Sequence, residues 1–299
     1  MKVLLFGHKG WIGNQVKDIL EIQKIDTILG SSRVDNKEQL LEEILLHTPT
    51  HIISTIGRTH GKINNKVYTT IDFLEQKGKV YENVRDNLFS PLVLALLCKQ
   101  HNIHLTYLGT GCIFKFDENH PFGKEVNGFT EESKPNFFDS SYSVVKGFTD
   151  ELMHFFEDDV LNVRIRMPIT SCTSGRNFIT KITTYEKICS VPNSMTVLDE
   201  LLPIMIDMAK NNIVGTINLT NPGLISHNEI LEMYKEIIDP NFNYQNFTIE
   251  EQSKILAAGR SNNYLDTSRL EKLYPKVNNI KDAIRKVLFK MLENKNKVL

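Results

Sequence analysis

The chain has 299 residues, of which 41% are hydrophobic, and this suits one large α/β domain or a core with a smaller lobe. The 35 basic and 36 acidic residues leave a net charge of −1, which argues against nucleic acid or an anionic membrane as a partner. No apolar run is long enough to span a membrane, and the four cysteines lack paired spacing. We therefore expect a cytoplasmic protein in a reducing compartment, without a metal site.

The N-terminus carries the pattern of a dinucleotide-binding site. A short apolar run at 2–6 leads into a glycine-rich segment at 7–13 and then into an amphipathic helix to about residue 23. In this order, glycines let backbone N–H groups approach a pyrophosphate at the positive helix N-terminus. The spacing is GxxGxxG rather than the stricter GxGxxG. The residues predicted to bind the cofactor here are Gly7, Gly10, Trp11, Ile12 and Gly13.

The end of the second predicted strand, at 26–29, bears on the choice of cofactor. NAD-binding folds usually place an acidic residue there for the ribose 2′-hydroxyl, whereas this chain has Ser31, Ser32 and Arg33. Two hydroxyls and a guanidinium suit a 2′-phosphate. The alternative is that Arg33 is a solvated loop residue. The sequence favours NADPH.

Alternation of helix and strand continues through the first half of the chain and predicts an α/β fold of Rossmann type, a doubly wound parallel sheet. We expect residues 1–166 to form the NADP-binding domain, with strands near 195–220 returning to it. Residues 167–299 are expected to form mainly a smaller C-terminal substrate-binding lobe. The further predicted elements are helices at 37–47, 81–100 and 142–157 and strands at 50–55, 103–108 and 161–166.

Three features of the second half of the chain predict local structure. Capping boxes begin helices at Ser226 and Thr248, because a glutamate follows each of them three residues later. Residues 201–208 are expected to form a helix that packs on the sheet. The charged tail from Lys290 is expected to fray.

Tyr142 and Lys146 are the strongest candidates for catalysis. Positions i and i+4 share one face of a helix, so the phenol and the ammonium are expected side by side. A phenol has an ordinary pKa of about 10, and a neighbouring ammonium stabilises the phenolate and lowers that pKa. The pair therefore predicts proton transfer on a carbonyl/alcohol couple. Cys112, at the end of a strand, adds a thiol that reduction does not need; it suggests carbon–hydrogen chemistry, with core packing as the alternative.

These residues carry a resemblance that covers nearly the whole chain. The glycine turn, the Tyr142/Lys146 pair and the sheet order resemble the extended short-chain dehydrogenase/reductase superfamily. More narrowly, the chain resembles the bifunctional nucleotide-4-keto-6-deoxysugar 3,5-epimerase/4-reductases of rhamnose synthesis. The matching segments are GTGCIF at 109–114, SSYSVVKG at 140–147, RIRMPI at 164–169, RNFITKI at 176–182, PNSMTVLDELLP at 192–203, NPGLISHNEILEMYKE at 221–236 and NFTIEEQ at 246–252.

The resemblance implies roles for residues that the pattern alone would not single out. Thr110 falls where the superfamily has its substrate-orienting Ser/Thr. Asn83 matches its helix asparagine, although Asp86-Asn87 replaces the usual following Gly-Thr. Arg260 falls where the diphosphate of the sugar nucleotide is gripped, and Asn177 is expected at the substrate.

Cys112 and Lys181 match the positions that carry out epimerisation in this family. Both C3 and C5 of a 4-keto sugar lie next to the ketone, and the resulting enolate would be held by Tyr142 and Thr110. Inversion needs protonation from the opposite face, hence two groups. NADPH would then deliver hydride to C4 while Tyr142 protonates the oxygen.

Three alternatives stay open on the sequence. A reductase-only enzyme of the dTDP-4-dehydrorhamnose type would not need Cys112 and Lys181, and a GDP-fucose-synthase-like enzyme would have histidine in place of that lysine. A non-catalytic nucleotide-binding regulatory subunit would not need the intact Tyr142/Lys146 pair. Apolar residues on the helices at 81–100 and 141–157 predict a homodimer. The sequence does not choose between UDP and dTDP.

Overall fold

The computed structural model describes residues 1–298 and contains two compact units. The first, unit 1, comprises Met1–Ile113, Lys134–Arg164 and Pro203–Ile217. The second, unit 2, comprises Phe114–Ser133, Ile165–Leu202 and the chain from Asn218 onward. Each unit is therefore assembled from segments that are distant in the sequence.

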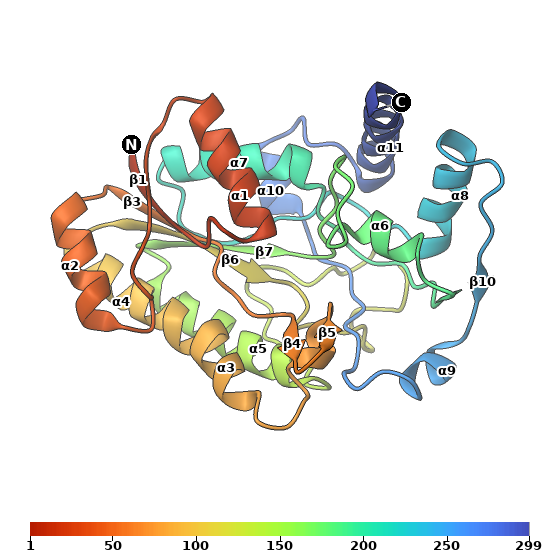
Figure 1. The fold of residues 1–299 in the computed structure, drawn as a ribbon, viewed down its shortest axis with the longest axis horizontal. Coiled ribbons are helices and arrows are strands. Elements are labelled where there is room, and N and C mark those ends of the chain that lie inside the picture. The colour runs from red at the N-terminus through yellow and green to blue at the C-terminus, as the bar shows by residue number, and fades with distance from the viewer. Residues whose placement is uncertain (299) are drawn as a thin grey trace. The chain divides into compact units, whose positions relative to one another are not determined.

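A six-stranded sheet with the order β2-β1-β3-β6-β7-β9 forms the centre of unit 1 (Figure 1). β1 pairs in parallel with β2 and β3, and β3 pairs in parallel with β6. Five of the six strands lie buried, as expected for a parallel sheet covered on both faces, whereas the edge strand β2 is partly exposed. This confirms the predicted Rossmann-type architecture. The strands are β1 (Lys2–Phe6), β2 (Asp26–Leu29), β3 (His51–Ser54), β6 (His104–Thr110), β7 (Val160–Ile165) and β9 (Gly215–Asn218).

Helices cover both faces of this sheet. Figure 1 shows α1 on one face and α2, α4 and α5 on the other. Valine, leucine and isoleucine side chains from the sheet pack with α4 in one apolar core, which also includes Leu40 and Ile44 of α2. The helices are α1 (Trp11–Ile22), α2 (Lys37–His47), α3 (Val80–Val84), α4 (Ser90–His101), α5 (Ser141–Met153) and the 3₁₀ turn η3 (His154–Phe156).

The helix predicted at 81–100 is interrupted by a π-helical turn, η2 (Arg85–Phe89), between α3 and α4. Pro91 lies at the start of α4 and has no N–H to donate to the Asn87 carbonyl one turn earlier. That carbonyl accepts the Thr149 hydroxyl at 2.6 Å instead. The proline thus accounts for the local change of helical hydrogen bonding.

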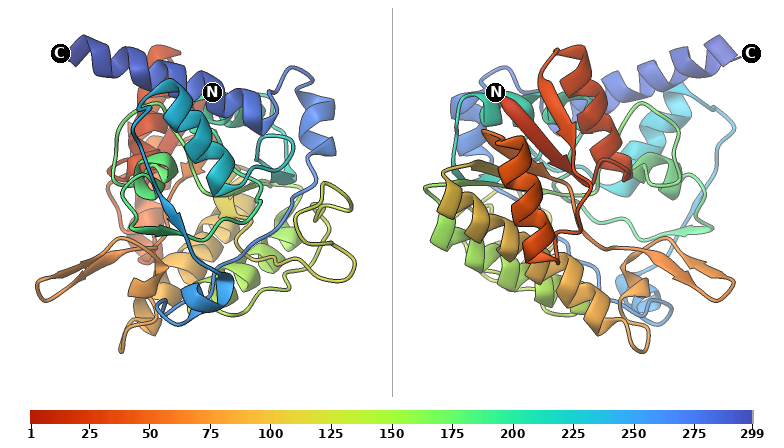
Figure 2. Two further views of the ribbon diagram at one scale, coloured as in Figure 1. Left: turned by 90° about the vertical axis from the view of Figure 1, so that its right-hand side faces the viewer. Right: turned by 60° about the vertical axis from the view of Figure 1, so that its left-hand side comes forward.

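A small antiparallel hairpin, β4 (Gly61–Ile63) and β5 (Lys66–Tyr68), follows β3 and projects away from the central sheet in both views of Figure 2. The 3₁₀ turn η1 (Ile71–Phe73) comes next. Phe73 and Leu74 pack against Tyr142, with Cys112 at the edge of the same cluster. The hairpin region therefore supplies apolar cover for the tyrosine.

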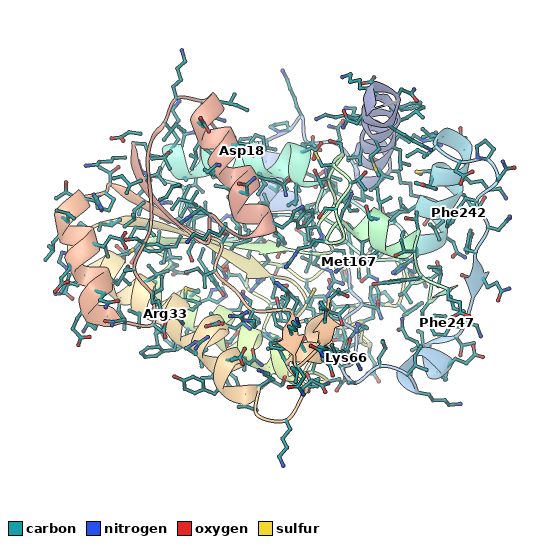
Figure 3. All side chains as sticks on the ribbon, in the orientation of Figure 1. Asp18, Arg33, Lys66, Met167, Phe242 and Phe247 are labelled. Carbon is teal, nitrogen blue, oxygen red and sulfur yellow. The ribbon has the colours of Figure 1, made fainter. Side chains whose placement is uncertain are left out.

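Unit 2 has its own apolar core, formed by residues such as Ile179, Ile230 and Ile284. α8 and α11 contact one another (Figure 2), and Figure 3 shows Phe242 near α8 and Phe247 near β10. α7 (Leu198–Lys210) contributes residues to both units. The other elements are α6 (Phe178–Ile182), β8 (Lys187–Ile188), α8 (His227–Ile237), β10 (Gln245–Asn246), α9 (Ile249–Ser253), α10 (Ser268–Leu273) and α11 (Ile280–Val298).

The ends of these helices test three local predictions. Both capping boxes are confirmed, at Ser226 with Glu229 and at Thr248 with Glu251. The expectation that the tail frays from Lys290 is wrong, because α11 continues to Val298. The apolar residues of α11 up to Met291 pack into the core of unit 2, and the charged end continues the helix that this packing anchors.

Candidate active site

The glycine turn between β1 and α1 is closed by contacts that exclude a side chain. Gly7 has φ +82°, and a Cβ on it would lie 2.4 Å from the Thr55 hydroxyl oxygen. A Cβ on Gly13 would lie 2.0 Å from the Gly7 carbonyl oxygen. Gly10 caps α1, and its N–H donates to Gly7 O at 2.9 Å. The turn is tight against the start of a helix, which fits the approach of a pyrophosphate to backbone N–H groups.

The loop after β2 hydrogen-bonds to a carboxylate on α2 that the sequence analysis missed. Glu43, on α2, accepts hydrogen bonds from the N–H and the hydroxyl of Ser31 and from those of Ser32, at 2.5–2.9 Å. Burial raises the pKa of Glu43, but these hydrogen bonds outweigh it, so the net pKa lies below its ordinary value. Arg33, labelled in Figure 3, pairs with Asp35 at 2.8 Å.

Thr110, Cys112 and Tyr142 come together in unit 1. β6 ends at Thr110, whose hydroxyl oxygen accepts the Cys112 N–H at 3.1 Å and whose side chain also hydrogen-bonds to Tyr142. The Cys112 carbonyl accepts the Ser143 hydroxyl at 2.8 Å, which ties this segment to the first turn of α5. Ser140 caps that helix by accepting the Ser143 N–H at 3.0 Å. The predicted grouping of these three side chains is therefore present.

The ionisation of Tyr142 differs from the sequence-based expectation. Burial, and then the neighbouring Cys112, raise the pKa of Tyr142, and the hydrogen bond with Thr110 offsets this only in part. A lowered pKa was expected from Lys146. Instead, the Lys146 ammonium donates a hydrogen bond to the hydroxyl of a second tyrosine, Tyr107. Tyr142 is thus held as a neutral phenol.

Burial also acts on Lys146 itself. It lowers the pKa of Lys146 to about 8. Two neighbours raise that pKa in part: Asp150, one turn further along α5, and Cys112. Asp150 in turn makes a buried bidentate pair with Arg164, at 2.9 and 2.6 Å. The ammonium is therefore only moderately stable in its charged form near neutrality.

Asn83 is buried at the join between α3 and α5. Its amide donates weakly to the Ser141 hydroxyl at 3.4 Å, and its carbonyl oxygen accepts from Asn87 at 2.8 Å. Asn87 also holds the backbone of Arg58, donating to its carbonyl at 2.9 Å and accepting its N–H at 2.8 Å. Sequence reasoning missed Asn87, which links the π-helical turn to the loop after β3.

In unit 2, Lys181 lies among cations. Burial lowers the pKa of Lys181, and the guanidinium groups of Arg176 and Arg260 lower it further. Arg176 was not predicted, although it begins the matched segment 176–182. Asn177, fully buried, caps α6 and donates to the carbonyls of Thr170 and Cys172 at 2.8 and 3.1 Å. The structure thus brings Lys181 and Arg260 together, and gives Asn177 the local task of shaping the loop before α6.

The predicted residues are distributed over both units. Unit 1 holds the glycine turn and Asn83, Thr110, Cys112, Tyr142 and Lys146, whereas unit 2 holds Asn177, Lys181 and Arg260. Within residues 1–298, no group of histidine, cysteine and carboxylate side chains could hold a metal ion. None of the helices in that range is long and apolar enough to cross a membrane.

Comparison with known proteins gives matches along almost the whole chain. The chain is 56% identical over 291 residues to a protein of Acanthamoeba polyphaga mimivirus, covering 97% of this chain and 99% of the relative. The crystal structure of the UDP-rhamnose synthase of that virus has a TM-score of 0.93 and 55% identity, over 97% of this chain and 99% of that chain. No protein-family profile matches.

Plant relatives are also similar. A bifunctional dTDP-4-dehydrorhamnose 3,5-epimerase/dTDP-4-dehydrorhamnose reductase of Arabidopsis thaliana is 45% identical over 287 residues, which is 96% of this chain and 92% of the relative. A trifunctional UDP-glucose 4,6-dehydratase/3,5-epimerase/reductase of the same plant is 44% identical over 290 residues, but this chain spans only 42% of it. A dTDP-4-dehydrorhamnose reductase from Clostridium acetobutylicum shares the fold, with a TM-score of 0.77 at 16% identity.

Proposed function

Since the chain belongs to the family of bifunctional nucleotide-sugar 3,5-epimerase/4-reductases of rhamnose synthesis, in the extended short-chain dehydrogenase/reductase superfamily, we propose that it makes a nucleotide-L-rhamnose. The substrate is a UDP- or dTDP-4-keto-6-deoxyglucose. Inversion at C3 and C5 comes first, and reduction at C4 follows. The observation that supports this best is the grouping of a thiol, Cys112, with Tyr142 and Thr110 at the end of β6.

The residues of the glycine turn fit a nicotinamide cofactor. The lack of room for a Cβ at Gly7 and Gly13 leaves the backbone open to a pyrophosphate, which Gly10, Trp11 and Ile12 at the start of α1 would help to hold. When bound, the cofactor supplies the hydride for C4. We propose NADPH rather than NADH, because Arg33 can pair with a 2′-phosphate.

In the reduction, Tyr142 gives its proton to the C4 oxygen. The phenol is protonated at neutral pH and can therefore act as the acid, although burial raises its pKa and makes it a weaker acid than a free phenol. Thr110 hydrogen-bonds to the same tyrosine and orients the ketone oxygen. Lys146 supplies positive charge in the surrounding buried region when it is protonated.

In the epimerisation, two side chains exchange protons with C3 and C5. Both carbons are acidified by the C4 ketone, and the enolate oxygen is stabilised by the donors of Tyr142 and Thr110. We assign proton removal and return to Cys112 and Lys181. The lowered pKa of Lys181 supports this role, because it raises the fraction of free amine, which is the form that accepts a proton.

The remaining assignments concern the substrate and the assembly. Arg260 binds the diphosphate of the sugar nucleotide, and Arg176 beside it supports the same anion, because guanidinium groups pair well with phosphate oxygens. Asn83 and Asn177 shape the substrate region. The protein is proposed to be a cytoplasmic homodimer that pairs through α4 and α5.

One experiment tests the whole proposal. The protein is incubated with UDP-4-keto-6-deoxyglucose and NADPH in deuterated water, and the product is examined by NMR. We expect a 6-deoxy-L-sugar with deuterium at C3 and C5. A reduced product without deuterium or inversion would indicate a reductase-only enzyme, and no turnover of either the UDP or the dTDP substrate would contradict the proposal. A GDP-4-keto-6-deoxymannose sample serves as the control for fucose-type activity.

A further inference from the structure

Tyr107 is a completely buried tyrosine that no part of the proposed chemistry uses. It lies in β6 between the apolar Leu105 and Leu108. The Lys146 ammonium donates a hydrogen bond to its hydroxyl, and the ammonium nitrogen lies 4.6 Å from the centroid of its ring. A phenol in a core is costly unless its hydroxyl is hydrogen-bonded, so this contact compensates for the burial of Tyr107.

The hydrogen-bond partner of Tyr107, the Lys146 ammonium, lies in the same apolar surroundings. Burial raises the pKa of Tyr107 well above its ordinary value, so the phenol stays neutral and its oxygen can accept from an ammonium. An ammonium that is withdrawn from water needs such an acceptor to stay charged. Tyr107 is therefore placed to decide how much of Lys146 is protonated.

We propose that Tyr107 is a positioning residue for the reduction step, and that its hydroxyl holds the ammonium of Lys146, one turn after Tyr142 on α5, in its charged form. This rests on the proposed function. The other ionisable groups that act on Lys146 are Asp150 on α5 and Cys112 after β6, and Tyr142 acts on Tyr107.

The carboxylate of Asp150 is hydrogen-bonded to residues other than Lys146. Both of its carboxylate oxygens bond to Arg164, and Oδ1 also accepts the Asn162 amide at 3.0 Å. Its charge stabilises the ammonium only through space. Removal of the Tyr107 hydroxyl therefore takes away the acceptor that contacts Lys146. The pKa of Lys146 should fall as a result.

The test is Tyr107→Phe, which deletes one oxygen and keeps the ring in the core. In the wild type, reduction should decline as Lys146 loses its proton above about pH 8. A hydrogen bond to a charged group is strong enough to move a pKa by about one unit. We expect the alkaline limb of the kcat profile for C4 reduction to move down by about one pH unit in the variant. KM for the nucleotide sugar should stay within about twofold, because Tyr107 does not touch the substrate.

Matched measurements separate a loss of the Tyr107–Lys146 hydrogen bond from a general packing effect of Tyr107→Phe. Tyr234→Phe removes a half-buried phenol from unit 2, and its profile should coincide with that of the wild type. Deuterium exchange at C3 and C5 without NADPH, and the thermal unfolding temperature, should change little in Tyr107→Phe. An unmoved alkaline limb, or a loss of exchange together with reduction, would overturn the inference. Failure of the wild type to exchange and reduce would instead overturn the proposed function.

Discussion

One carboxylate oxygen of Glu43 accepts two hydrogen bonds from Ser32, from its N–H at 2.9 Å and from its hydroxyl at 2.5 Å. Ser31 makes the same pair of contacts with the other carboxylate oxygen, at 2.7 and 2.8 Å. A hydroxyl proton that is donated to Glu43 cannot also be donated to a phosphate. The proposed preference for NADPH therefore depends on Arg33, whose side chain is 60% exposed.

Arg33→Ala should raise KM for NADPH roughly 10- to 100-fold, since charge-assisted hydrogen bonds contribute about 1.5–3 kcal/mol. KM for NADH should change little, because NADH has no 2′-phosphate. Steady-state kinetics with both cofactors measure this. Lys17→Ala, which removes a partly exposed cation on α1, is the control and should affect neither value. Equal effects of Arg33→Ala on both cofactors would contradict the assignment.

Tyr142→Phe should lower the rate of C4 reduction by about 10²–10⁴-fold, because the acid that protonates the oxygen is lost. Deuterium exchange at C3 or C5 should be slowed much less than reduction, since Thr110 still stabilises the enolate and the carbon protons are handled by Cys112 and Lys181. NMR in deuterated water reports both activities in one sample. Reduction at the wild-type rate in this variant would show that Tyr142 is not the acid.

Cys112→Ser and Lys181→Met should each block inversion while NADPH still binds. Serine keeps the shape of the side chain but hardly ionises near neutrality, and methionine keeps much of the lysine stem without its charge. The loss of a general acid or base costs roughly 10²–10⁴-fold. The matched controls are Cys172→Ser and Lys187→Met, which change an exposed cysteine and an exposed lysine of unit 2. A wild-type yield of the L-sugar from both active-site variants would refute the epimerisation scheme.

Protonation of two neighbouring buried histidines should make unit 1 sensitive to acid. His51 and His104 are paired across β3 and β6 with ring centroids 5.1 Å apart. Burial lowers both pKa values, and the charge of His104 lowers that of His51 further. Histidines with a depressed folded pKa stabilise the fold fully above the unfolded value of 6.5, and this contribution is lost as pH falls below it.

The measurement is the free energy of unfolding in urea between pH 7.5 and 5. His104→Gln keeps a donor for the Ile213 carbonyl, which His104 contacts at 2.8 Å, but cannot take up a proton. Its slope against pH should be shallower than that of the wild type by at most about 1.4 kcal/mol per pH unit, the value for one proton. Parallel curves for the two proteins would mean that the histidine pair does not titrate on unfolding.

The exposed aromatic side chains of unit 1 predict self-association. Phe148 on α5 and Phe155 on η3 are 59% and 77% exposed, and Leu96 on α4 is 51% exposed. Large apolar side chains in such number on neighbouring helices mark an interface more often than free surface. Light scattering at micromolar concentration should give a dimer for the wild type and a monomer for Phe148→Ser/Phe155→Ser. A monomeric wild type would exclude the homodimer.

The fold was largely predictable because its signals are local. Apolar runs of strand length, the alternation with amphipathic helices and the two capping boxes each depend on residues close in sequence. The π-helical turn could not be read in the same way. It depends on Pro91 together with Thr149, a hydroxyl from another helix that satisfies the released carbonyl.

The site was predictable only in part. The Tyr142/Lys146 spacing reveals a shared helix face, but it does not reveal that Lys146 hydrogen-bonds to Tyr107. An aromatic residue in a strand is most simply interpreted as part of the core, so Tyr107 gives no signal in the sequence. Glu43 lies in a run of helix-forming residues, and its contact with Ser31 and Ser32 arises only when α2 folds against β2. Arg176 and Arg260 are distant in sequence, so their joint effect on Lys181 is a product of the tertiary structure.

The membership of Phe114–Ser133 in unit 2 has a consequence for biosynthesis. This segment leaves unit 1 between β6 and α5, and Phe129 then pairs with Leu265 and accepts the Asn218 amide at 2.8 Å. Such distant partners meet late, because a long loop must close before their contacts form. A nascent chain can thus form the glycine turn early, whereas the lobe that carries Lys181 and Arg260 stays unfinished until Leu265 has left the ribosome.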